Sequence, residues 1–161
     1  MKIRDETPAD FTAIRAVVNA AFPGPAEARL VDRLRADGDA VYSLVAVEDV
    51  AVVGHVMFSR MTAPVRALGL GPLAVAPGRQ RTGIGRRLVH SGLARARDDG
   101  WEAVFVLGDP AYYQRFGFTA TFAAGFTSPY AGPHLMGLAL GDDPLATTTG
   151  RIAYALAFSA V

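Results

Sequence analysis

The stretch "LAVAPGRQRTGIGRRL", residues 73–88, changes from an apolar run to a turn of glycine and arginine, and then to a helical pattern. Glycine lets the backbone approach a ligand closely, and the unpaired N–H groups at a helix start attract anions. Arg79, Arg81 and Arg86 add positive charge that can bind phosphate. The stretch therefore indicates a phosphate-binding loop, although the same glycines would also suit a tight turn packed on a sheet.

Two common phosphate-binding loops are excluded by the residues that stand here. A P-loop requires Gly-Lys-Ser/Thr, whereas Gly83 is followed by Ile84 and Gly85. A dinucleotide-binding loop requires a third glycine at the position of Leu88. The missing P-loop lysine disfavours a nucleotide-phosphate hydrolase, and the spacing alone leaves a phosphate site and a structural turn as alternatives.

Composition narrows the class of protein. With 161 residues, 51% hydrophobic and 19% charged, the chain fits a single globular domain over residues 1–161. A net charge of +1 gives no whole-molecule field for nucleic acid, so we expect no nucleic-acid partner. The absence of cysteine excludes thiolate metal sites and a cysteine nucleophile. His90 and His134 have no partner at ligand spacing, so we expect no metal.

The sequence carries no pattern that would direct it to a membrane. The charged start "MKIRDETPAD" (1–10) lacks the apolar core of a signal peptide. No apolar run approaches the roughly 20 residues that a membrane-spanning helix needs. We therefore expect a cytoplasmic protein with no membrane partner.

Hydrophobic periodicity and turn residues predict an α/β domain with a mixed sheet. An acidic turn separates two β-rich segments at 42–48 and 50–59, which we expect to pair as an antiparallel hairpin. The remaining expected strands are 2–4, 65–75, 101–108, a segment after 118, and the apolar runs 134–140 and 151–161. The expected helices start at Thr7-Pro8, after Pro25 and after Gly83, with a short helical turn capped by Asp109.

Two motifs in order resemble the GNAT superfamily of acyl-CoA-dependent N-acyltransferases. Its pyrophosphate loop has the pattern Gln/Arg-x-x-Gly-x-Gly/Ala, which Gln80, Gly83 and Gly85 match between a strand and a long helix. The family also places a tyrosine four residues before a Gly-Phe pair, as in "YQRFGF" (113–118). The surrounding phrases resemble the bacterial YhbS-like branch of the family over nearly the whole chain.

The resemblance implies an α/β (α+β) fold with a mixed, mostly antiparallel central sheet flanked by helices, and splayed strands at the acyl-CoA site. It implies acetyl-CoA as co-substrate, with pantetheine and the acetyl carbonyl bound by free backbone groups of a strand edge. That edge corresponds to Leu73, Ala74 and Val75. The pyrophosphate would be held by the backbone of Gln80, Arg81, Thr82, Gly83, Ile84 and Gly85, helped by the side chains of Arg79, Arg81 and Arg86.

The implied reaction is direct attack of a neutral amine on the thioester carbonyl, and the absence of cysteine favours this over a cysteine acyl-enzyme. Tyr113 is then the general acid, because its family counterpart directs its hydroxyl at the departing sulfur. A phenol is protonated at neutral pH and can donate to a thiolate. The alternative for Tyr113 is a core aromatic residue, and Tyr112 is one residue out of register.

The general base is less well marked. Many relatives place a glutamate on the strand before the loop, but this sequence has none between Val65 and Val75. The candidate substitutes are Glu27, early in the second helix, and His55, on an apolar strand. Glu27 can equally be a solvated first-turn carboxylate, and His55 can equally be a hydrogen-bonded core histidine.

Two functions remain as expectations. One is an N-acetyltransferase acting on a primary amine of a small molecule or peptide; the other is a non-catalytic acyl-CoA-binding sensor or interaction module of the same fold. The acceptor groove would be built from the early helices, the loop "FTSPYAGPH" (126–134) and the tail, where no pattern identifies a substrate. Family members often form homodimers, and the apolar C-terminal run, expected as a strand, would serve that role or complete the sheet.

Overall fold

The strands of the first sixty residues pair antiparallel with their neighbours in the chain. The computed structural model describes residues 1–161, and in it β1 (Lys2–Asp5), β2 (Ala40–Glu48) and β3 (Ala51–Arg60) form two antiparallel ladders. Asp49, at φ 54°, makes the turn between β2 and β3. The predicted hairpin is therefore confirmed.

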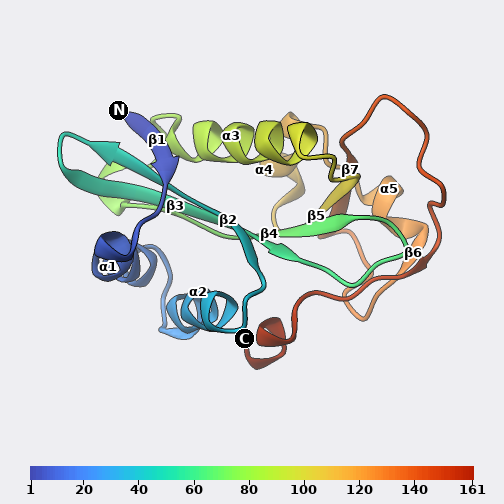
Figure 1. Cartoon of the computed structure of the whole chain (residues 1–161), viewed down its shortest axis with the longest axis horizontal. Coiled ribbons are helices and arrows are strands. Elements are labelled where there is room, and N and C mark those ends of the chain that lie inside the picture. Colours follow the sequence, from blue (N-terminus) through green and yellow to red (C-terminus); the bar gives the residue numbers. More distant parts are fainter. The chain divides into compact units, whose positions relative to one another are not determined.

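Helices cover both faces of this part of the sheet. The short 3-10 helix η1 (Pro8–Asp10) leads into α1 (Phe11–Ala21), and α2 (Ala26–Ala36) follows; these two α-helices lie on one face. The helix α3 (Ile84–Asp98) begins on the opposite face (Figure 1). A side chain at Gly92 of α3 would collide with the Phe58 ring, which shows how closely the helix lies on β3.

Three further strands complete a mixed, mostly antiparallel sheet. β4 (Ala67–Val75) pairs parallel with β5 (Ala103–Leu107) from Ala67 to Gly69, and β5 pairs antiparallel with β7 (Leu135–Ala139). The strand order is β1-β2-β3-β4-β5-β7. The α/β fold class expected from the sequence is confirmed.

The chain divides into two compact units. The first unit comprises residues 1–59, 71–92 and 156–161; the second comprises 60–70 and 93–155. β4 and α3 each contribute residues to both units. The expectation of a single domain over residues 1–161 stays a prediction. None of the helices is long and apolar enough to cross a membrane.

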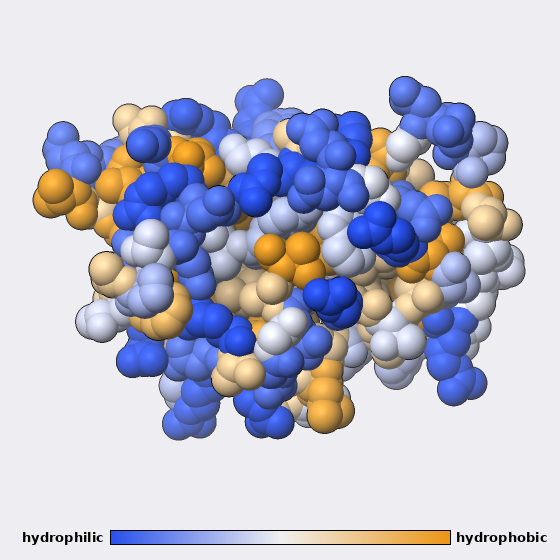
Figure 2. All heavy atoms as spheres, in the orientation of Figure 1, coloured by the Kyte–Doolittle hydropathy of each residue, from blue (hydrophilic) through white to orange (hydrophobic).

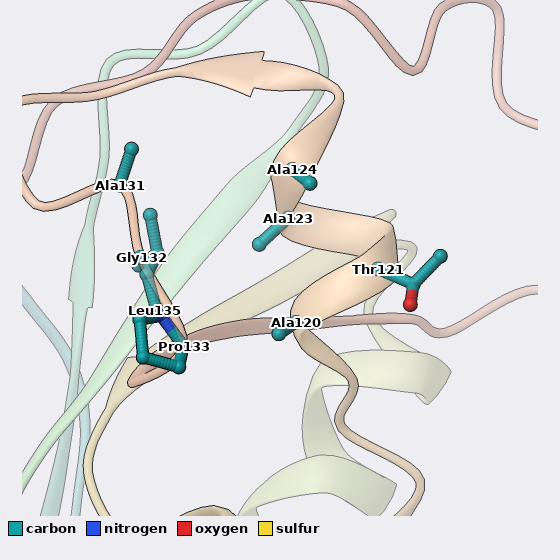
Figure 3. A pocket seen from close by; sticks show the side chains of 8 residues that line it. All are labelled: Ala120, Thr121, Ala123, Ala124, Ala131, Gly132, Pro133 and Leu135. Atoms are coloured by element: carbon teal, nitrogen blue, oxygen red, sulfur yellow. The ribbon is translucent and has the colours of Figure 1, made fainter.

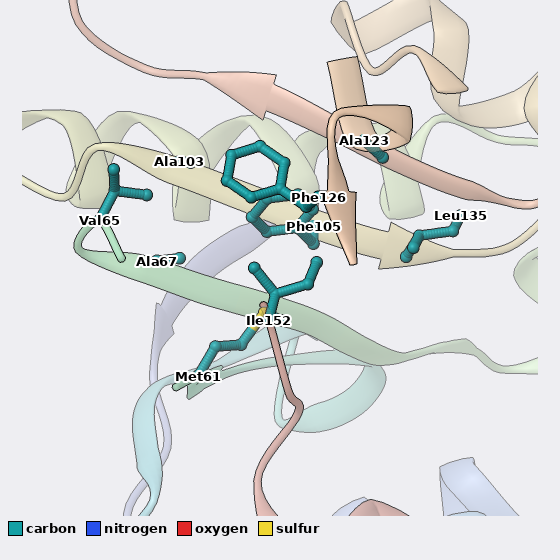
Figure 4. Packing of buried hydrophobic residues seen from close by; sticks show 9 residues of the cluster. All are labelled: Met61, Val65, Ala67, Ala103, Phe105, Ala123, Phe126, Leu135 and Ile152. Atoms are coloured by element: carbon teal, nitrogen blue, oxygen red, sulfur yellow. The ribbon is translucent and has the colours of Figure 1, made fainter. Parts of the chain in front are cut away.

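The second unit has its own apolar core between β5, β7 and the segments that follow them (Figure 4). The ring of Phe105 lies edge-on to that of Phe126, with 5.2 Å between the ring centres. Burying such rings supplies most of the stability of a small core. The cluster consists of Met61, Val65, Ala67, Ala103, Phe105, Ala123, Phe126, Leu135 and Ile152.

Two predicted strands are wrong. After Phe118, the Thr119 hydroxyl accepts a hydrogen bond from the Phe122 N–H and starts the helix α5 (Ala120–Ala124). A strand of two residues, β6 (Phe126–Thr127), follows and pairs with β8 (Gly150–Arg151). The C-terminal run ends as a 3-10 helix, η4 (Leu156–Ala160), since a continuous apolar run does not by itself distinguish a strand from a helix.

A short helix, α4 (Pro110–Tyr113), follows β5 as expected. The carboxylate of Asp109 accepts a hydrogen bond from the Ala111 N–H at 3.0 Å, which confirms Asp109 as its N-cap. A 3-10 turn, η3 (Gln114–Phe116), continues the chain to Gly117, whose φ of 99° ends it. This segment fixes the position of Tyr113 within the second unit.

Candidate active site

The loop between β4 and α3 is held at both ends. At its start the Ala76 N–H donates to the Val53 carbonyl at 2.8 Å, which ties the loop to β3. The 3-10 turn η2 (Pro77–Arg79) then reverses the chain. At its end the Arg87 N–H donates to the Gly83 carbonyl at 3.1 Å and begins the hydrogen-bond pattern of α3. The first N–H groups of the helix have no partner inside it and are open to an anion.

Backbone conformation explains why glycine stands in this loop. Gly83 has a φ of 91°, which disfavours any residue with a Cβ. Arg81 also adopts a left-handed conformation, at φ 64°. The Thr82 hydroxyl donates to the Arg79 carbonyl at 2.5 Å, and the Gln80 amide donates to the Val75 carbonyl at 3.2 Å. The Gln80 side chain therefore stabilises the conformation of the loop by a hydrogen bond to the end of β4.

A hollow of about 420 Å³ opens at the start of α3. Arg86 and Arg87 line it from the first turn of the helix, and both are exposed. The surface over α3 is hydrophilic (Figure 2). The combination of two guanidinium groups and a helix N-terminus suits a phosphate group. The hollow is lined by Thr82, Gly83, Arg86, Arg87, His90 and Ser91.

Arg79 differs from the other arginines of the loop. Its Nε lies 2.8 Å from Oε2 of Glu48, at the end of β2. This ion pair directs the guanidinium toward the β2–β3 hairpin and neutralises its charge. Of Arg79, Arg81 and Arg86, only Arg86 lines the hollow at the start of α3, and the phosphate contacts expected of all three stay predictions.

The end of β4 presents mostly backbone. Ala74 is buried, while Leu73 and Val75 are half-buried. A Cβ at Gly54 of β3 would stand 3.3 Å from the Ala74 carbonyl oxygen, so the two strands approach closely here. β4 has nine residues and β5 has five, so β5 cannot pair with the whole of β4.

Tyr113 lies in the second unit, seated on a glycine. A Cβ at Gly108 would stand 2.5 Å from Cε2 of its ring, so glycine there makes room for the tyrosine. The ring lies edge-on to Phe118, with 5.9 Å between ring centres, and to Tyr112, at 5.0 Å. Burial raises the pKa of Tyr113, and neighbouring Tyr112 adds to the effect, so the hydroxyl is protonated at neutral pH.

The first candidate base, Glu27, lies in the first turn of α2 and is half-buried. A carboxylate there is favoured by the positive end of the helix dipole. This position is compatible both with a catalytic base and with a helix-stabilising carboxylate. The geometry of the first unit leaves both interpretations of Glu27 in place.

The second candidate base, His55, is fully buried in a polar network of the first unit. Its Nε2 lies 2.7 Å from the Ser43 hydroxyl, which in turn donates to Glu6 at 2.5 Å. Because Ser43 uses its proton on Glu6, His55 must donate from Nε2, which leaves Nδ1 as a buried acceptor without a hydrogen-bond partner. Burial lowers the pKa of His55.

Arg35 completes this network. Its guanidinium donates twice to the Glu6 carboxylate, at 2.8 and 2.9 Å, and stacks over the Phe11 ring at 3.9 Å. Burial by itself would raise the pKa of Glu6, but hydrogen bonds from His55, Arg35 and Ser43 lower it to about 2. The network therefore holds an ionised carboxylate and a neutral imidazole in the core.

A second hollow, of about 400 Å³, lies between α5 and the loop before β7 (Figure 3). Its lining is almost entirely apolar and contains no side chain that could act as a general acid or base. The structure contains no group of three or more His, Asp or Glu side chains placed to hold a metal ion. The residues that line the hollow are Ala120, Thr121, Ala123, Ala124, Ala131, Gly132, Pro133 and Leu135.

Sequence reasoning missed one aromatic residue near Tyr113. Tyr154 lies in the C-terminal segment, yet its ring covers Gly69 of β4 and contacts Tyr130. These residues are far apart in the chain, and no motif spacing connects them. The only sequence signal is a glycine in an otherwise apolar strand, which indicates the close approach of another group.

Comparisons with known proteins agree with this geometry. The sequence profile of the acetyltransferase (GNAT) family matches residues 11–118. The uncharacterized N-acetyltransferase YhbS of Escherichia coli strain K12 is 37% identical over 160 residues, which cover 96% of each chain.

Two solved structures are similar over almost the whole chain. The crystal structure of E. coli YhbS in complex with CoA has a TM-score of 0.92 at 36% identity, covering 98% of this chain and 91% of that one. A GNAT family acetyltransferase from Brucella melitensis in complex with acetyl-CoA has a TM-score of 0.81 at 38% identity, covering 98% and 97%. The profile match spans more than half of the chain, and these identities extend over nearly all of it. The chain belongs to the GNAT family of acetyltransferases.

Proposed function

We propose that this N-acetyltransferase transfers an acetyl group from acetyl-CoA directly to a primary amine. Family membership supports the reaction, and the relatives solved with CoA or acetyl-CoA support the donor. The single observation that carries the proposal is the loop between β4 and α3, where Gly83 at positive φ leads into a helix start lined by arginine.

The donor would be bound mainly by backbone groups. The N–H groups of residues 80–85 would hold the pyrophosphate, with charge from Arg81 and Arg86. The backbone of Leu73, Ala74 and Val75 would bind pantetheine and the acetyl carbonyl as an added strand does. The length of β4 beyond what β5 can pair supports this assignment.

In the reaction the amine nitrogen attacks the carbonyl carbon of the thioester and forms the new C–N bond. The tetrahedral intermediate then collapses, the C–S bond breaks, and CoA leaves as a thiolate that takes a proton from the Tyr113 hydroxyl. The raised pKa of Tyr113 keeps this proton in place until the sulfur becomes negative. The bound product, an amide, has lost one amine proton.

We assign acceptance of that amine proton to Glu27, through water. His55 is the weaker candidate because it is fully buried and engaged with Ser43. The amine attacks in its neutral form, so the reaction is expected to accelerate as pH rises and more of the amine is neutral. We further propose that the enzyme works in the cytoplasm, and sedimentation would decide whether it forms a homodimer.

A thiol-release assay with acetyl-CoA tests the function over amino acids, polyamines, aminoglycosides and peptides. The chain has no cysteine, so the protein gives no thiol background. Release that requires an amine and collapses in Tyr113→Phe supports the enzyme. The missing strand glutamate favours the second candidate, an acyl-CoA-binding module. Thermal stabilisation by acetyl-CoA without turnover of any amine would support that module.

A further inference from the structure

Three tyrosines from separate segments meet in the second unit. Tyr113 belongs to α4, Tyr130 to the loop between β6 and β7, and Tyr154 to the segment after β8. We call these three residues the tyrosine cluster. The established family features account only for Tyr113, so the other two residues require an explanation of their own.

Tyr154 is seated on the strand β4. A Cβ at Gly69 would stand 2.8 Å from both Cδ1 and Cε1 of the Tyr154 ring, so only glycine lets the ring lie there. Gly69 pairs with Phe105 in the parallel ladder, which fixes the backbone under the ring. The strand that carries a glutamate in many relatives is therefore covered here by an aromatic side chain.

Tyr130 extends this aromatic surface to solvent. Its ring lies edge-on to Tyr154, with 5.9 Å between ring centres, and the residue is 42% exposed. Residues 126–133 around it carry no charged side chain. A loop of this composition cannot bind a polycationic amine through ion pairs, but it can bind an apolar or aromatic body.

The hydroxyl groups of the cluster are close enough to influence one another. The hydroxyl oxygen of Tyr154 is buried, and both Tyr130 and Tyr113 act on it electrostatically. Burial raises the pKa of Tyr154 and of Tyr113, so both are neutral phenols at physiological pH. The cluster thus combines aromatic faces with neutral hydroxyls beside the residue proposed to protonate the leaving thiolate.

We propose that Tyr130 and Tyr154 form the acceptor-binding wall of the active site and select a primary amine attached to an aromatic body. The inference rests on the proposed function, because it places the amine next to Tyr113. Tyr130 and the ring of Tyr154 pack against the aromatic body of the acceptor. The Tyr154 hydroxyl is buried, so the contact that Tyr154 offers to the acceptor is that of its ring.

The test compares phenethylamine with hexylamine, which has a similar apolar size but no ring. Calorimetry measures binding of each to the CoA-saturated protein, and thiol release measures turnover with acetyl-CoA. We expect phenethylamine to bind about fivefold more tightly, since aromatic pairs add to the burial of area. Tyr130→Leu removes that preference. Tyr154→Phe keeps the ring and should therefore keep the preference for phenethylamine.

Tyr42→Phe is the matched control, because it removes a tyrosine hydroxyl from the buried face of β2 in the first unit. Tyr42→Phe should leave the binding and the turnover of both amines as they are in the unmodified protein. Equal binding of the two amines, or the same preference in Tyr130→Leu, overturns the inference. If the protein still acetylates an amine in that case, the proposed function stands. A ring preference lost in Tyr130→Leu, with no turnover of any amine, keeps the binding wall and refutes the acetyltransferase.

Discussion

The donor loop of the first unit and the tyrosine cluster of the second unit are proposed to bind their ligands by different means. The donor loop, residues 76–87, would bind acetyl-CoA through backbone N–H groups, whose direction is set by Gly83 at positive φ and by the start of α3. The tyrosine cluster works through the side chains of Tyr113, Tyr130 and Tyr154, each seated on or against another segment. The loop therefore requires particular conformations, whereas the cluster requires particular side chains.

This difference determines how each region should respond to substitution. A change in the loop should alter acetyl-CoA binding and leave the amine step untouched. A change in the cluster should alter the amine step and leave acetyl-CoA binding untouched.

The largest effect is expected from Tyr113→Phe. Loss of a general acid typically lowers kcat by about 10²–10⁴-fold, while the Kd for acetyl-CoA should stay within about twofold. Stopped-flow thiol release and calorimetry measure the two quantities. Tyr112→Phe is the matched control and should retain kcat. Equal activity of the two variants would remove Tyr113 from the mechanism.

Acid should destabilise the protein through the ionised Glu6 of the first unit, and not through Tyr113 and Tyr154, whose phenols are already neutral. Glu6 has a pKa of about 2 in the folded chain, so its stabilisation, about 3 kcal/mol, is present above pH 4.5 and lost as pH falls toward 2. Burial lowers the pKa of His55, so the unfolded chain binds more protons below pH 6.5, and stability falls there too.

Urea denaturation between pH 8 and pH 3 measures this loss. We expect the free energy of unfolding to decrease steadily on acidification below pH 6.5. Glu6→Gln should be less stable at pH 7 and show a shallower decrease below pH 4.5. A free energy of unfolding that is independent of pH from 7 to 3 would show that the Glu6 network does not contribute.

Gly83→Ala tests the conformation of the donor loop. An alanine at positive φ costs about 1–2 kcal/mol, so we expect the Kd for acetyl-CoA to rise about tenfold. Gly78→Ala is the matched control, because Gly78 lacks a positive φ and has open space around it. Calorimetry should find the control unchanged; equal loss in both variants would contradict a conformational role for Gly83.

Gly69→Ala tests the seat of the tyrosine cluster. The added methyl group would stand 2.8 Å from the Tyr154 ring and must displace it. We expect kcat/KM for phenethylamine to fall about fivefold, because the aromatic contact is displaced, while acetyl-CoA binds as before. Loss of acetyl-CoA binding in this variant would instead mean that the two regions are not separable.

The smallest effect is expected from Arg79. Its guanidinium is paired with Glu48 and 53% exposed, and exposed pairs contribute about 0–1 kcal/mol. Arg79→Gln should therefore change the Kd for acetyl-CoA less than about threefold. Arg86→Gln, in the hollow at the start of α3, should raise it more. The reverse ranking, measured by calorimetry, would assign the phosphate contact to Arg79.

The donor loop could be predicted from the sequence because its determinants are contiguous. Gln80, Gly83 and Gly85 have fixed spacing, and the flanking apolar patterns place them between β4 and α3. The loop's internal contacts were not predictable. The sequence does not indicate that the Gln80 amide donates to the Val75 carbonyl or that Arg79 pairs with Glu48, since both contacts depend on side-chain conformation.

The acceptor side was harder to predict for a physical reason. Gly69, Tyr130 and Tyr154 come together through the sheet and the C-terminal segment, and no local pattern records that contact. The C-terminal run was also expected as a strand, but composition alone does not distinguish continuous apolar residues in a strand from those in the 3-10 helix η4. Contacts between distant segments decide both cases.

The most direct test is an initial-rate matrix of thiol release against acetyl-CoA and phenethylamine, with the product identified by mass spectrometry. Direct transfer predicts N-acetylphenethylamine as product and intersecting double-reciprocal lines, because both substrates must be bound before the C–N bond forms. Parallel lines, or thiol release that does not depend on the amine, would contradict direct acetyl transfer to an amine.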